Sequence, residues 1–183
     1  MTSSSGPLDR PDRASDAFPR PALTVFLLVG LTGAGKTTYA ERVLRPAGVV
    51  RLSVDEIVFA RHGRYDIDYP AAEYFALYEP ALAEVRLALL RELELGRDVA
   101  LDLGIWSRAQ RDDWKALIEA AGGRWRLLYF RVSRAELLRR LGERNLLEHA
   151  NALRVTEADL DDFYARFEEP VGEGEEIIEP SAY

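Results

Sequence analysis

Short apolar runs alternate along the chain with longer amphipathic stretches. Four runs, at residues 23–30, 49–53, 98–104 and 125–132, have the length and composition of buried strands. A fifth, more polar segment at residues 175–178 is expected to form a short last strand. Between these runs, apolar residues recur at helical spacing. Strands that alternate with helices predict an α/β fold with a mainly parallel sheet covered by helices on both faces.

Capping and stop residues mark the expected helix boundaries. Ser53, Ser107 and Ser133 each stand three residues before Glu or Gln, which is the pattern of a capping box, and the segment from 156 to 167 repeats the signature. Pro80 is expected to kink or split the longest helix. The predicted helices cover about 36–44, a short stretch after 53, 71–95, 107 to the glycine pair at 122–123, 133 to about 147, and 156–167.

Composition narrows the classes of function. The chain has 183 residues, is 48% hydrophobic and 30% charged, and fits one globular domain at 21–183, preceded by a disordered tail at 1–20. The absence of cysteine excludes disulfides and thiolate chemistry. A net charge of −7 argues against nucleic acid and membranes as partners, and the lack of an apolar run long enough for a secretory signal or a membrane span predicts a cytoplasmic protein.

The run GLTGAGKTT begins where the first predicted strand ends. It has the spacing of a phosphate-binding loop, G-x-x-x-x-G-K-[ST], with a strand before it and a helix after it. Its glycines let backbone N–H groups turn toward phosphate oxygens, and the helix N-terminus adds partial positive charge. Lys36 is expected to reach the β- and γ-phosphates, and the Thr37 hydroxyl to bind Mg²⁺. The residues expected to bind ATP or GTP are Gly30, Thr32, Gly33, Ala34, Gly35, Lys36, Thr37 and Thr38.

Lysine is rare in the rest of the chain, which has 22 arginines and one other lysine, Lys115. The alternative to a phosphate site is a plain glycine-rich turn between a strand and a helix. A compact ammonium can reach between phosphates where a planar guanidinium would crowd the loop. The choice of Lys36 in an arginine-rich chain therefore favours the phosphate site.

Two aspartates follow predicted strands on the side of the sheet where α/β proteins bind ligands. Asp102 ends the third strand and is expected either to hold Mg²⁺ through its water shell or to cap the following turn. Asp55 follows the second strand and is expected either to act as the general base that takes the proton of an acceptor hydroxyl or to stabilise the start of a helix through its dipole. Glu56 is explained by the capping box with Ser53.

Arg140 and Arg144 are four residues apart and therefore share one face of the helix that follows the fourth strand. They are expected either to neutralise charge on a transferred phosphoryl group, as catalytic residues of a lid, or to belong to a solvated arginine-rich face. Trp106 is consistent both with stacking on a substrate and with packing beneath a loop. The residues expected to contact the acceptor are Asp55, Arg61, Trp106, Arg108 and Arg111.

Several segments together resemble the small P-loop kinases, a group of AAA family ATPases that includes chloramphenicol phosphotransferase, zeta toxin and the kinase domain of polynucleotide kinase. The segments are GLTGAGKTT, SVDEI, VALDLGIWSRAQR, FRVSRAELLRRLGERN and FYARFEEP, and the resemblance extends over about residues 23–178. It implies a three-layer α/β/α P-loop NTPase fold with sheet order 2-3-1-4-5 and a helical lid. It also implies ATP or GTP with Mg²⁺ as cofactors, bound by Lys36 and Thr37, with Asp55 as base and a lid arginine at Arg140 or Arg144.

Two departures separate the chain from better-defined members of this group. Polynucleotide kinases usually have an arginine three residues after the base, where this chain has Val58. Shikimate kinases have a second aspartate beside the base and a glycine triplet after the third strand, and this chain has neither. The resemblance therefore favours ATP-dependent phosphorylation of a hydroxyl on a small molecule. A nucleic-acid 5′-hydroxyl kinase and a nucleotide-dependent regulatory switch are the alternatives.

Overall fold

Five strands form one parallel sheet in the order β2-β3-β1-β4-β5, in a computed structural model that describes residues 22–145 and 155–179. The strands span Thr24–Val29 (β1), Val50–Leu52 (β2), Val99–Leu101 (β3), Arg124–Phe130 (β4) and Glu175–Ile178 (β5). The predicted fold class, strand order and short last strand are confirmed.

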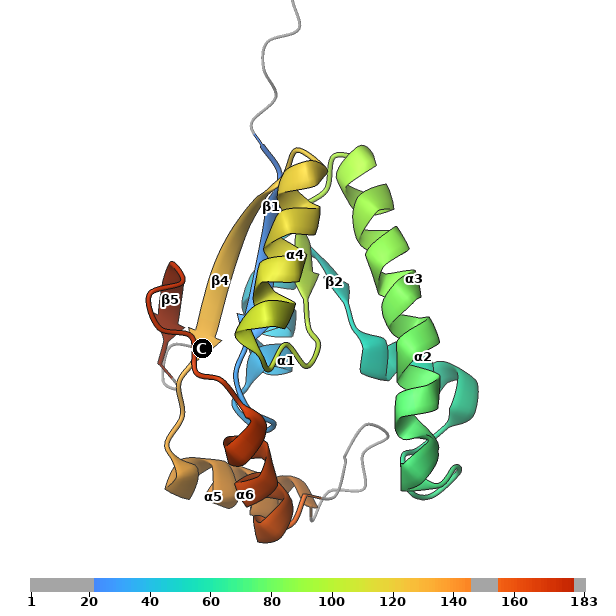
Figure 1. Cartoon of the computed structure of the whole chain (residues 1–183), viewed down its shortest axis with the longest axis vertical. Helices are drawn as coiled ribbons and strands as arrows, with labels where there is room; N and C mark the ends of the chain where they lie inside the picture. Colours follow the sequence, from blue (N-terminus) through green and yellow to red (C-terminus); the bar gives the residue numbers. More distant parts are fainter. Residues whose placement is uncertain (1–21, 146–154, 180–183) are drawn as a thin grey trace, which may run out of the picture.

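Six α-helices lie within the described residues. They span Lys36–Tyr39 (α1), Val54–His62 (α2), Tyr74–Glu94 (α3), Arg108–Ala120 (α4), Arg134–Asn145 (α5) and Glu157–Arg166 (α6). Apolar residues of α2, α3 and α4 share one half of the core, and those of α5 and α6 share the other. Figure 1 shows α5 and α6 beyond the carboxyl ends of the strands, next to the loop that joins β1 to α1.

The central strand β1 supplies both halves of the core. Val25, Leu27 and Val29 pack on the side of α3 and α4, while Phe26 and Leu28 pack on the opposite side, with α5. All six residues of the strand are buried. This arrangement explains why β1 reads as a continuous apolar run rather than an alternating one, since a central parallel strand is covered on both faces.

The helix after β1 differs from the prediction in its later turns. It is a regular α-helix only over Lys36–Tyr39, continues as a π-helix at Ala40–Leu44, and tightens into a 3₁₀ turn at Arg45–Ala47. Gly48, with a φ of 85°, then ends it. The predicted end at Leu44 is correct for the helical region before the proline-containing turn, but the regular geometry expected there is not present.

Pro80 lies inside the continuous helix α3, so the expectation that it could split this helix is wrong. The predicted range of 71–95 holds, with a 3₁₀ turn at Ala71–Glu73 before α3 begins. A proline removes one backbone donor from the helix. The buried residues Ala81, Val85 and Leu89 follow it on one face and hold the helix against the sheet.

Helix caps confirm the predicted starts of α4 and α2, but they correct the role expected for Glu56 at α2. Ser107 accepts a hydrogen bond from the Gln110 amide at 3.2 Å, and the Gln110 side chain accepts from the Ser107 amide at 3.0 Å, which completes a capping box. At α2, Ser53 accepts from the Glu56 amide at 3.4 Å. The Glu56 carboxylate does not return to Ser53 but binds Arg51, so the expected explanation of Glu56 as a capping-box partner is wrong.

Some predicted features lie outside the described residues. These are the tail at 1–20, the end of the fifth helix near 147, and the side chain of Arg144. Within 22–145 and 155–179, no helix combines the length and the apolar character needed to cross a membrane.

Candidate active site

The loop between β1 and α1 turns through glycines that pack closely against their surroundings. Gly33 has a φ of 82°, and a Cβ there would lie 3.1 Å from Cδ2 of Leu141 in α5. At Gly30, a Cβ would approach the carbonyl oxygen of Phe130 to 2.9 Å. Glycine is therefore required at both positions. The contact between Gly33 and Leu141 also brings the predicted lid helix onto the loop.

Lys36 begins α1, and its side chain lies over the loop. The Nζ of Lys36 donates hydrogen bonds to the carbonyl oxygens of Gly30, at 2.6 Å, and Leu31, at 3.1 Å. Thr37 and Thr38 follow on the exposed surface of the same turn. One strand–loop–helix unit thus brings together all the residues expected to bind a nucleotide: Gly30, Thr32, Gly33, Ala34, Gly35, Lys36, Thr37 and Thr38.

Arg140 in α5 reaches the phosphate loop. Its Nη1 donates to the carbonyl oxygen of Ala34 at 3.3 Å, and its Nε binds Glu136 at 2.7 Å. Arg139 instead forms ion pairs with Glu136 and Glu143 on exposed surface. The two arginines, Arg139 and then Arg140, hold the pKa of Glu136 down to about 2. Arg140 therefore faces the phosphate loop, whereas Arg139 lies on the surface of the same helix.

Asp55 lies in the first turn of α2, two residues after the N-cap Ser53. Its Oδ1 accepts a hydrogen bond of 2.6 Å from the hydroxyl of Tyr74, at the start of α3. Part of the Asp55 side chain is open to solvent, yet the protein around it displaces water and raises its pKa above the ordinary 3.8. The charge of Asp102 acts in the same direction, whereas the Tyr74 hydrogen bond and the charge of Lys36 lower the pKa. Asp55 is therefore within electrostatic reach of the phosphate loop.

Asp102 is buried at the end of β3 and is held by Arg51 of β2. The Nη1 of Arg51 donates to Asp102 Oδ2 at 2.9 Å, and its Nε donates to Glu41 at 2.8 Å. A third bond joins Arg51 to Glu56. The negative charge of Asp102 is thus compensated across two neighbouring strands. The sequence analysis missed Arg51, whose only signal was a charged residue in the middle of a short strand.

A group of tyrosines lies near Asp55. Tyr65, Tyr69, Tyr74 and Tyr78, called the tyrosine cluster below, are each half-buried. Ring centroids lie 5.5 Å apart for Tyr65 and Tyr74, 6.2 Å for Tyr65 and Tyr69, and 5.7 Å for Tyr74 and Tyr78. Half of the eight tyrosines in the chain fall within this stretch, which is the signal that the sequence offered.

The expected acceptor residues Arg61 and Arg108 lie on exposed surface. Arg61 binds Glu84 of α3, with Nη2 2.6 Å from Oε2. The side chain of Arg108 lies 3.8 Å from Asp112 in the next turn, and its backbone amide donates to Glu168 at 2.6 Å. Both arginines therefore have carboxylate neighbours, and neither contacts Asp55 in the described part of the chain.

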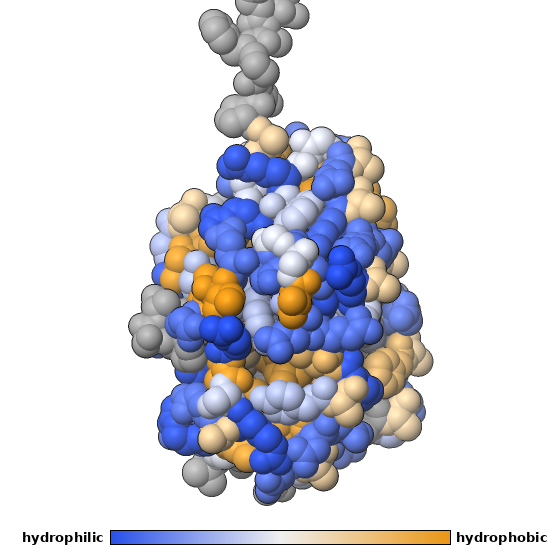
Figure 2. All heavy atoms as spheres, turned by 60° about the vertical axis from the view of Figure 1, so that its left-hand side comes forward, coloured by the Kyte–Doolittle hydropathy of each residue, from blue (hydrophilic) through white to orange (hydrophobic). Residues whose placement is uncertain are grey.

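Trp106 packs against α6. Its ring meets Phe163 edge to face with centroids 5.0 Å apart, and the guanidinium of Arg166 lies 5.3 Å from its centroid. Figure 2 shows hydrophobic side chains gathered between the body of the molecule and the segment formed by α5 and α6, within a mainly hydrophilic face. These contacts favour the packing interpretation of Trp106 over stacking on an acceptor.

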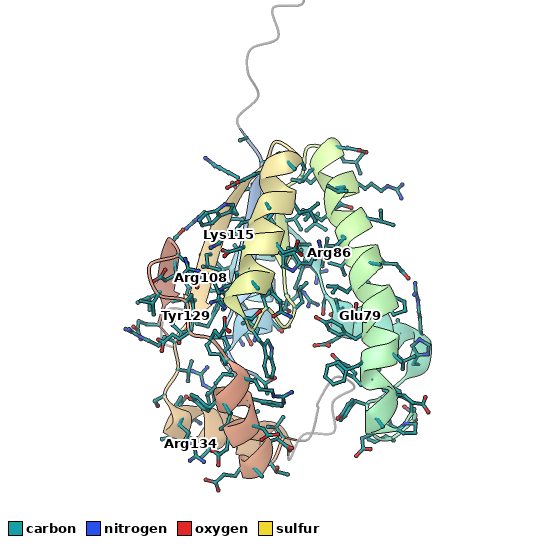
Figure 3. The ribbon with its side chains drawn as sticks, in the orientation of Figure 1. Glu79, Arg86, Arg108, Lys115, Tyr129 and Arg134 are labelled. Atoms are coloured by element: carbon teal, nitrogen blue, oxygen red, sulfur yellow. The ribbon has the colours of Figure 1, made fainter. Side chains whose placement is uncertain are left out.

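Arg111 is the one expected acceptor residue that the structure removes from the site. It is fully buried, and its guanidinium binds both carboxylate oxygens of Glu173 at 2.6 and 2.8 Å. Its Nη1 also donates to the carbonyl oxygen of Trp106 at 3.2 Å. These contacts argue against the prediction that Arg111 contacts a substrate, because its donors are used to join α4 to the C-terminal segment. Arg108 and Lys115 lie along the same edge of α4 (Figure 3).

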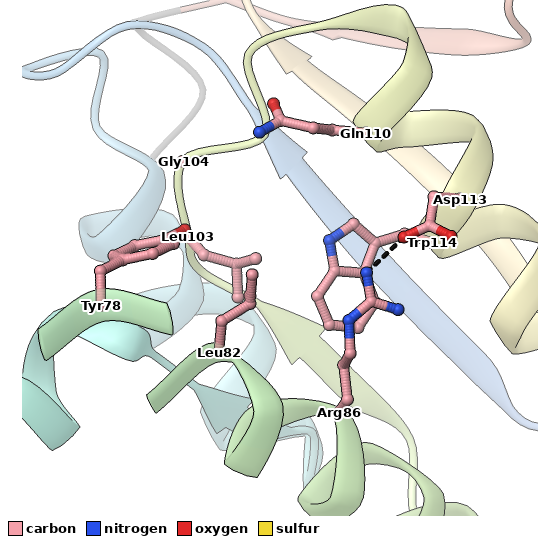
Figure 4. Close-up of a pocket in the computed structure, with 8 residues that line it drawn as sticks. All are labelled: Tyr78, Leu82, Arg86, Leu103, Gly104, Gln110, Asp113 and Trp114. Carbon is pink, nitrogen blue, oxygen red and sulfur yellow. Dashed lines mark hydrogen bonds and ion pairs between the residues drawn. The ribbon is translucent and has the colours of Figure 1, made fainter. Parts of the chain in front are cut away.

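A small pocket lies between α3, α4 and the residues that follow β3. Arg86 of α3 closes one end, where it lies 4.5 Å over the ring of Trp114 and pairs with Asp113 (Figure 4). Tyr78 of the tyrosine cluster lines another side, so the pocket adjoins the surroundings of Asp55. Its lining residues are Tyr78, Leu82, Arg86, Leu103, Gly104, Gln110, Asp113 and Trp114.

A protein-family model described as an AAA domain matches residues 25–170. The chain belongs to this AAA domain family. No curated protein sequence matches the chain. The match begins in β1 and ends at residue 170, after α6, so it includes the phosphate loop, Asp55 and Arg140.

Solved structures share the fold of this AAA domain at low sequence identity. A candidate kinase from Chloroflexus aurantiacus J-10-fl superposes with a TM-score of 0.67 and 15% identity, covering 88% of this chain and 90% of that chain. A gluconokinase from Sinorhizobium meliloti 1021 gives 0.56 and 19%, covering 89% and 85%. A chain of the Pnkp1/Rnl/Hen1 RNA repair complex gives 0.65 and 17%, covering 80% and 44%. The resemblance to AAA family P-loop kinases is confirmed for family and fold.

Proposed function

We propose that this protein is a P-loop kinase that transfers the γ-phosphate of ATP to a hydroxyl group of a small molecule. The observation that carries the proposal is the position of Asp55, a carboxylate with a raised pKa that Tyr74 holds within electrostatic reach of Lys36. A carboxylate beside a phosphate loop has the chemistry of a general base. The kinases among the structural neighbours agree with this function.

The donor half of the reaction is assigned to the phosphate loop. The loop amides and the start of α1 would hold the phosphates, and Lys36 would leave its two loop carbonyls to bind the β- and γ-phosphates. Arg140, which contacts the loop at Ala34, would neutralise charge on the transferred phosphoryl group. Arg144 is proposed as its companion only by its position four residues later on α5.

The acceptor half is assigned to Asp55. Tyr74 binds Oδ1, and Oδ2 has no hydrogen-bond partner in the described part of the chain, so this oxygen is the one that would face an acceptor hydroxyl. As the hydroxyl oxygen bonds to the γ-phosphorus, its proton passes to Asp55 and the bond from phosphorus to the bridging oxygen breaks, releasing ADP. The raised pKa of Asp55 makes it a stronger base than an ordinary aspartate.

Magnesium fits the donor half through Thr37 and Asp102. No group of three or more histidine or acidic side chains suited to a metal exists within 22–145 and 155–179. Mg²⁺ is commonly bound by one or two protein oxygens together with substrate phosphates, and a hydroxyl and a carboxylate beside the loop supply such oxygens. Thr37 and Asp102 would hold the ion, whose positive charge would offset the negative charge of the phosphates. Arg51 would position the Asp102 carboxylate, which it holds at 2.9 Å.

The test measures ADP release from the full chain with Mg·ATP and a panel of hydroxyl compounds, with Lys36→Ala as the blank. An acceptor-dependent rate supports the proposal, and Asp55→Asn should lower that rate by about 10²- to 10⁴-fold while ATP still binds. A regulatory switch would hydrolyse ATP slowly, with no acceleration by any acceptor. Transfer by Asp55→Asn at the wild-type rate would show that Asp55 is not the base.

A second candidate function is phosphorylation of a nucleic-acid 5′-hydroxyl, which the fold shared with the RNA repair complex brings forward. The surroundings of Asp55 oppose it, because residues 55–84 contain seven acidic residues and only two arginines. A polyanionic strand would be repelled there. Phosphate transfer to a 5′-hydroxyl oligonucleotide faster than to any small alcohol would favour this second candidate.

A further inference from the structure

The tyrosine cluster lies next to Asp55, to which Tyr74 donates a hydrogen bond, and is built from two segments. Tyr65 and Tyr69 belong to the segment between α2 and α3, and Tyr74 and Tyr78 occupy successive turns of α3. Their rings meet edge to face or tilted, with centroids 5.5 to 6.2 Å apart. Each ring is half-buried, so each keeps part of its surface open. A group of partly open aromatic rings next to a reactive carboxylate is a surface for binding, not only for packing.

All four phenols remain neutral at physiological pH. Desolvation raises the pKa of each, and negative charges add to this effect, with Tyr78 reaching about 12. Neutral tyrosine rings present electron-rich faces, which attract cations and have no comparable attraction for anions. The cluster is therefore suited to a positively charged group.

The charged residues around the cluster also favour a positively charged ligand. Both arginines of residues 55–84 are already paired with carboxylates, Arg61 with Glu84 and Arg64 with Asp68. The remaining acidic residues of that stretch are Asp55, Glu56, Asp66, Glu73 and Glu79.

Acidic residues on other elements extend the same field. Asp102 at the end of β3 raises the pKa of Asp55, and Asp159 of α6 raises that of Tyr65. Negative charge thus reaches the cluster from α2, α3 and α6. Among the described cations near Asp55, Lys36 belongs to the phosphate loop and Arg51 is surrounded by carboxylates.

We propose that the acceptor is a cationic alcohol, a compound that carries both a hydroxyl and an ammonium group. Its ammonium group packs against the exposed parts of the Tyr65, Tyr69 and Tyr78 side chains, and its hydroxyl reaches Asp55 Oδ2. The inference rests on the proposed kinase function and adds the charge class of the substrate. During transfer the ammonium group does not react: the hydroxyl proton goes to Asp55, the new bond joins the hydroxyl oxygen to the γ-phosphorus, and ADP leaves.

Three alcohols of similar size isolate the effect of charge. Choline carries a permanent positive charge, 3,3-dimethylbutan-1-ol is its neutral carbon analogue, and 2-hydroxyethanesulfonate carries a permanent negative charge. Binding to the full chain is followed by NMR through shifts of the tyrosine ring protons, with a non-hydrolysable ATP analogue and Mg²⁺ present. ADP release is measured with the same three compounds and Mg·ATP. The expected order in both assays is choline, then the neutral alcohol, then the sulfonate.

Variants locate the binding surface. Tyr65→Leu removes one ring without touching the hydrogen bond to Asp55 and should weaken choline binding by about twofold to thirtyfold, the range of one cation–π contact. Tyr65→Phe keeps the ring face and should bind choline nearly as well as the wild type. The matched control is Tyr164→Leu, at an exposed tyrosine on α6 outside the cluster, which should leave choline binding unchanged.

The outcomes separate this inference from the proposed function. Choline binding at the cluster without phosphate transfer to any hydroxyl compound would support the ligand class and overturn the kinase function. Phosphate transfer with the sulfonate bound more tightly than choline, or with no difference among the three alcohols, would support the kinase and overturn the ligand class. Equal weakening of choline binding by Tyr65→Leu and Tyr164→Leu would also overturn it, because the effect would then not come from the cluster.

Discussion

Replacing Arg111 by methionine is expected to destabilise the fold while leaving the proposed acceptor site intact. The guanidinium is fully buried, holds Glu173 through two hydrogen bonds of 2.6 and 2.8 Å, and donates to the Trp106 carbonyl at 3.2 Å. Methionine fills a similar volume but leaves the buried Glu173 carboxylate with Lys115, at 3.4 Å, as its remaining cation. The loss of stability in Arg111→Met therefore measures the free-energy cost of burying the Glu173 carboxylate without its main partner.

The magnitude follows from that geometry. Removing one partner of a buried ion pair costs about 3–5 kcal/mol, and because Lys115 keeps part of the compensation we expect about 3 kcal/mol. In a chain of this size, such a loss lowers Tm by about 6–12 °C. Arg111 is the main cause that lowers the pKa of Glu173 below the ordinary 4.5. The contribution of the pair is therefore complete above that pH and is lost as the pH falls through the lower folded-state pKa.

Thermal and urea unfolding at pH 7, followed by circular dichroism, measure the loss for Arg111→Met. The double variant Arg111→Met/Glu173→Leu removes both charges and should recover most of the stability, which a double-mutant cycle would report as coupling. Acceptor KM is measured at a temperature where all variants are folded. A raised KM with unchanged Tm would refute the structural role and restore Arg111 as a substrate contact.

Three further predictions concern the site and its supports. Asp55→Asn should raise the free energy of unfolding at neutral pH, because a folded-state pKa above 3.8 means that the charged form costs stability there, and urea titrations should show the gain disappearing below pH 3.8. Gly33→Ala and Gly48→Ala both place a side chain at positive φ, at a cost of about 1–2 kcal/mol, but only Gly33→Ala meets Leu141 and should weaken binding of a fluorescent ATP analogue. Ser107→Ala removes the cap of α4 and should cost about 1 kcal/mol, seen as a Tm lower by about 2–4 °C.

The features that the sequence predicted well depend on neighbouring residues. The capping box at Ser107 and Gln110 and the phosphate loop involve groups within a few residues of one another, so their spacing alone defines them. The strand order came from the family resemblance rather than from the residues themselves. The π-helical turns at Ala40–Leu44 were missed because nothing in the amphipathic pattern distinguishes them from a regular helix.

The features that the sequence did not predict depend on distant contacts. Arg111 and Arg108 have the same side chain and lie three residues apart, but only the guanidinium of Arg111 binds a distant carboxylate, that of Glu173, 62 residues later. One signal was present: Arg111 shares a helix face with Trp114 and Ile118, both buried, and a charged residue on an apolar face is a candidate for a buried ion pair. Its partner could not be identified without the position of the C-terminal segment.

The two halves of the proposed site also differ in whether their residues are neighbours in the sequence. This difference explains why the sequence predicts the phosphate donor but not the acceptor. The phosphate loop is a continuous segment whose backbone is expected to bind the phosphates, so its glycines and Lys36 stand at fixed spacing within one motif. The proposed acceptor side combines Asp55 of α2 with Tyr74 of α3, two side chains 19 residues apart that meet at 2.6 Å only after the helices pack. Because neither residue type is demanded by its own helix, the pair carries little local signal. The charge and aromatic character of the assembled surface, rather than any motif, is therefore the property from which an acceptor can be inferred.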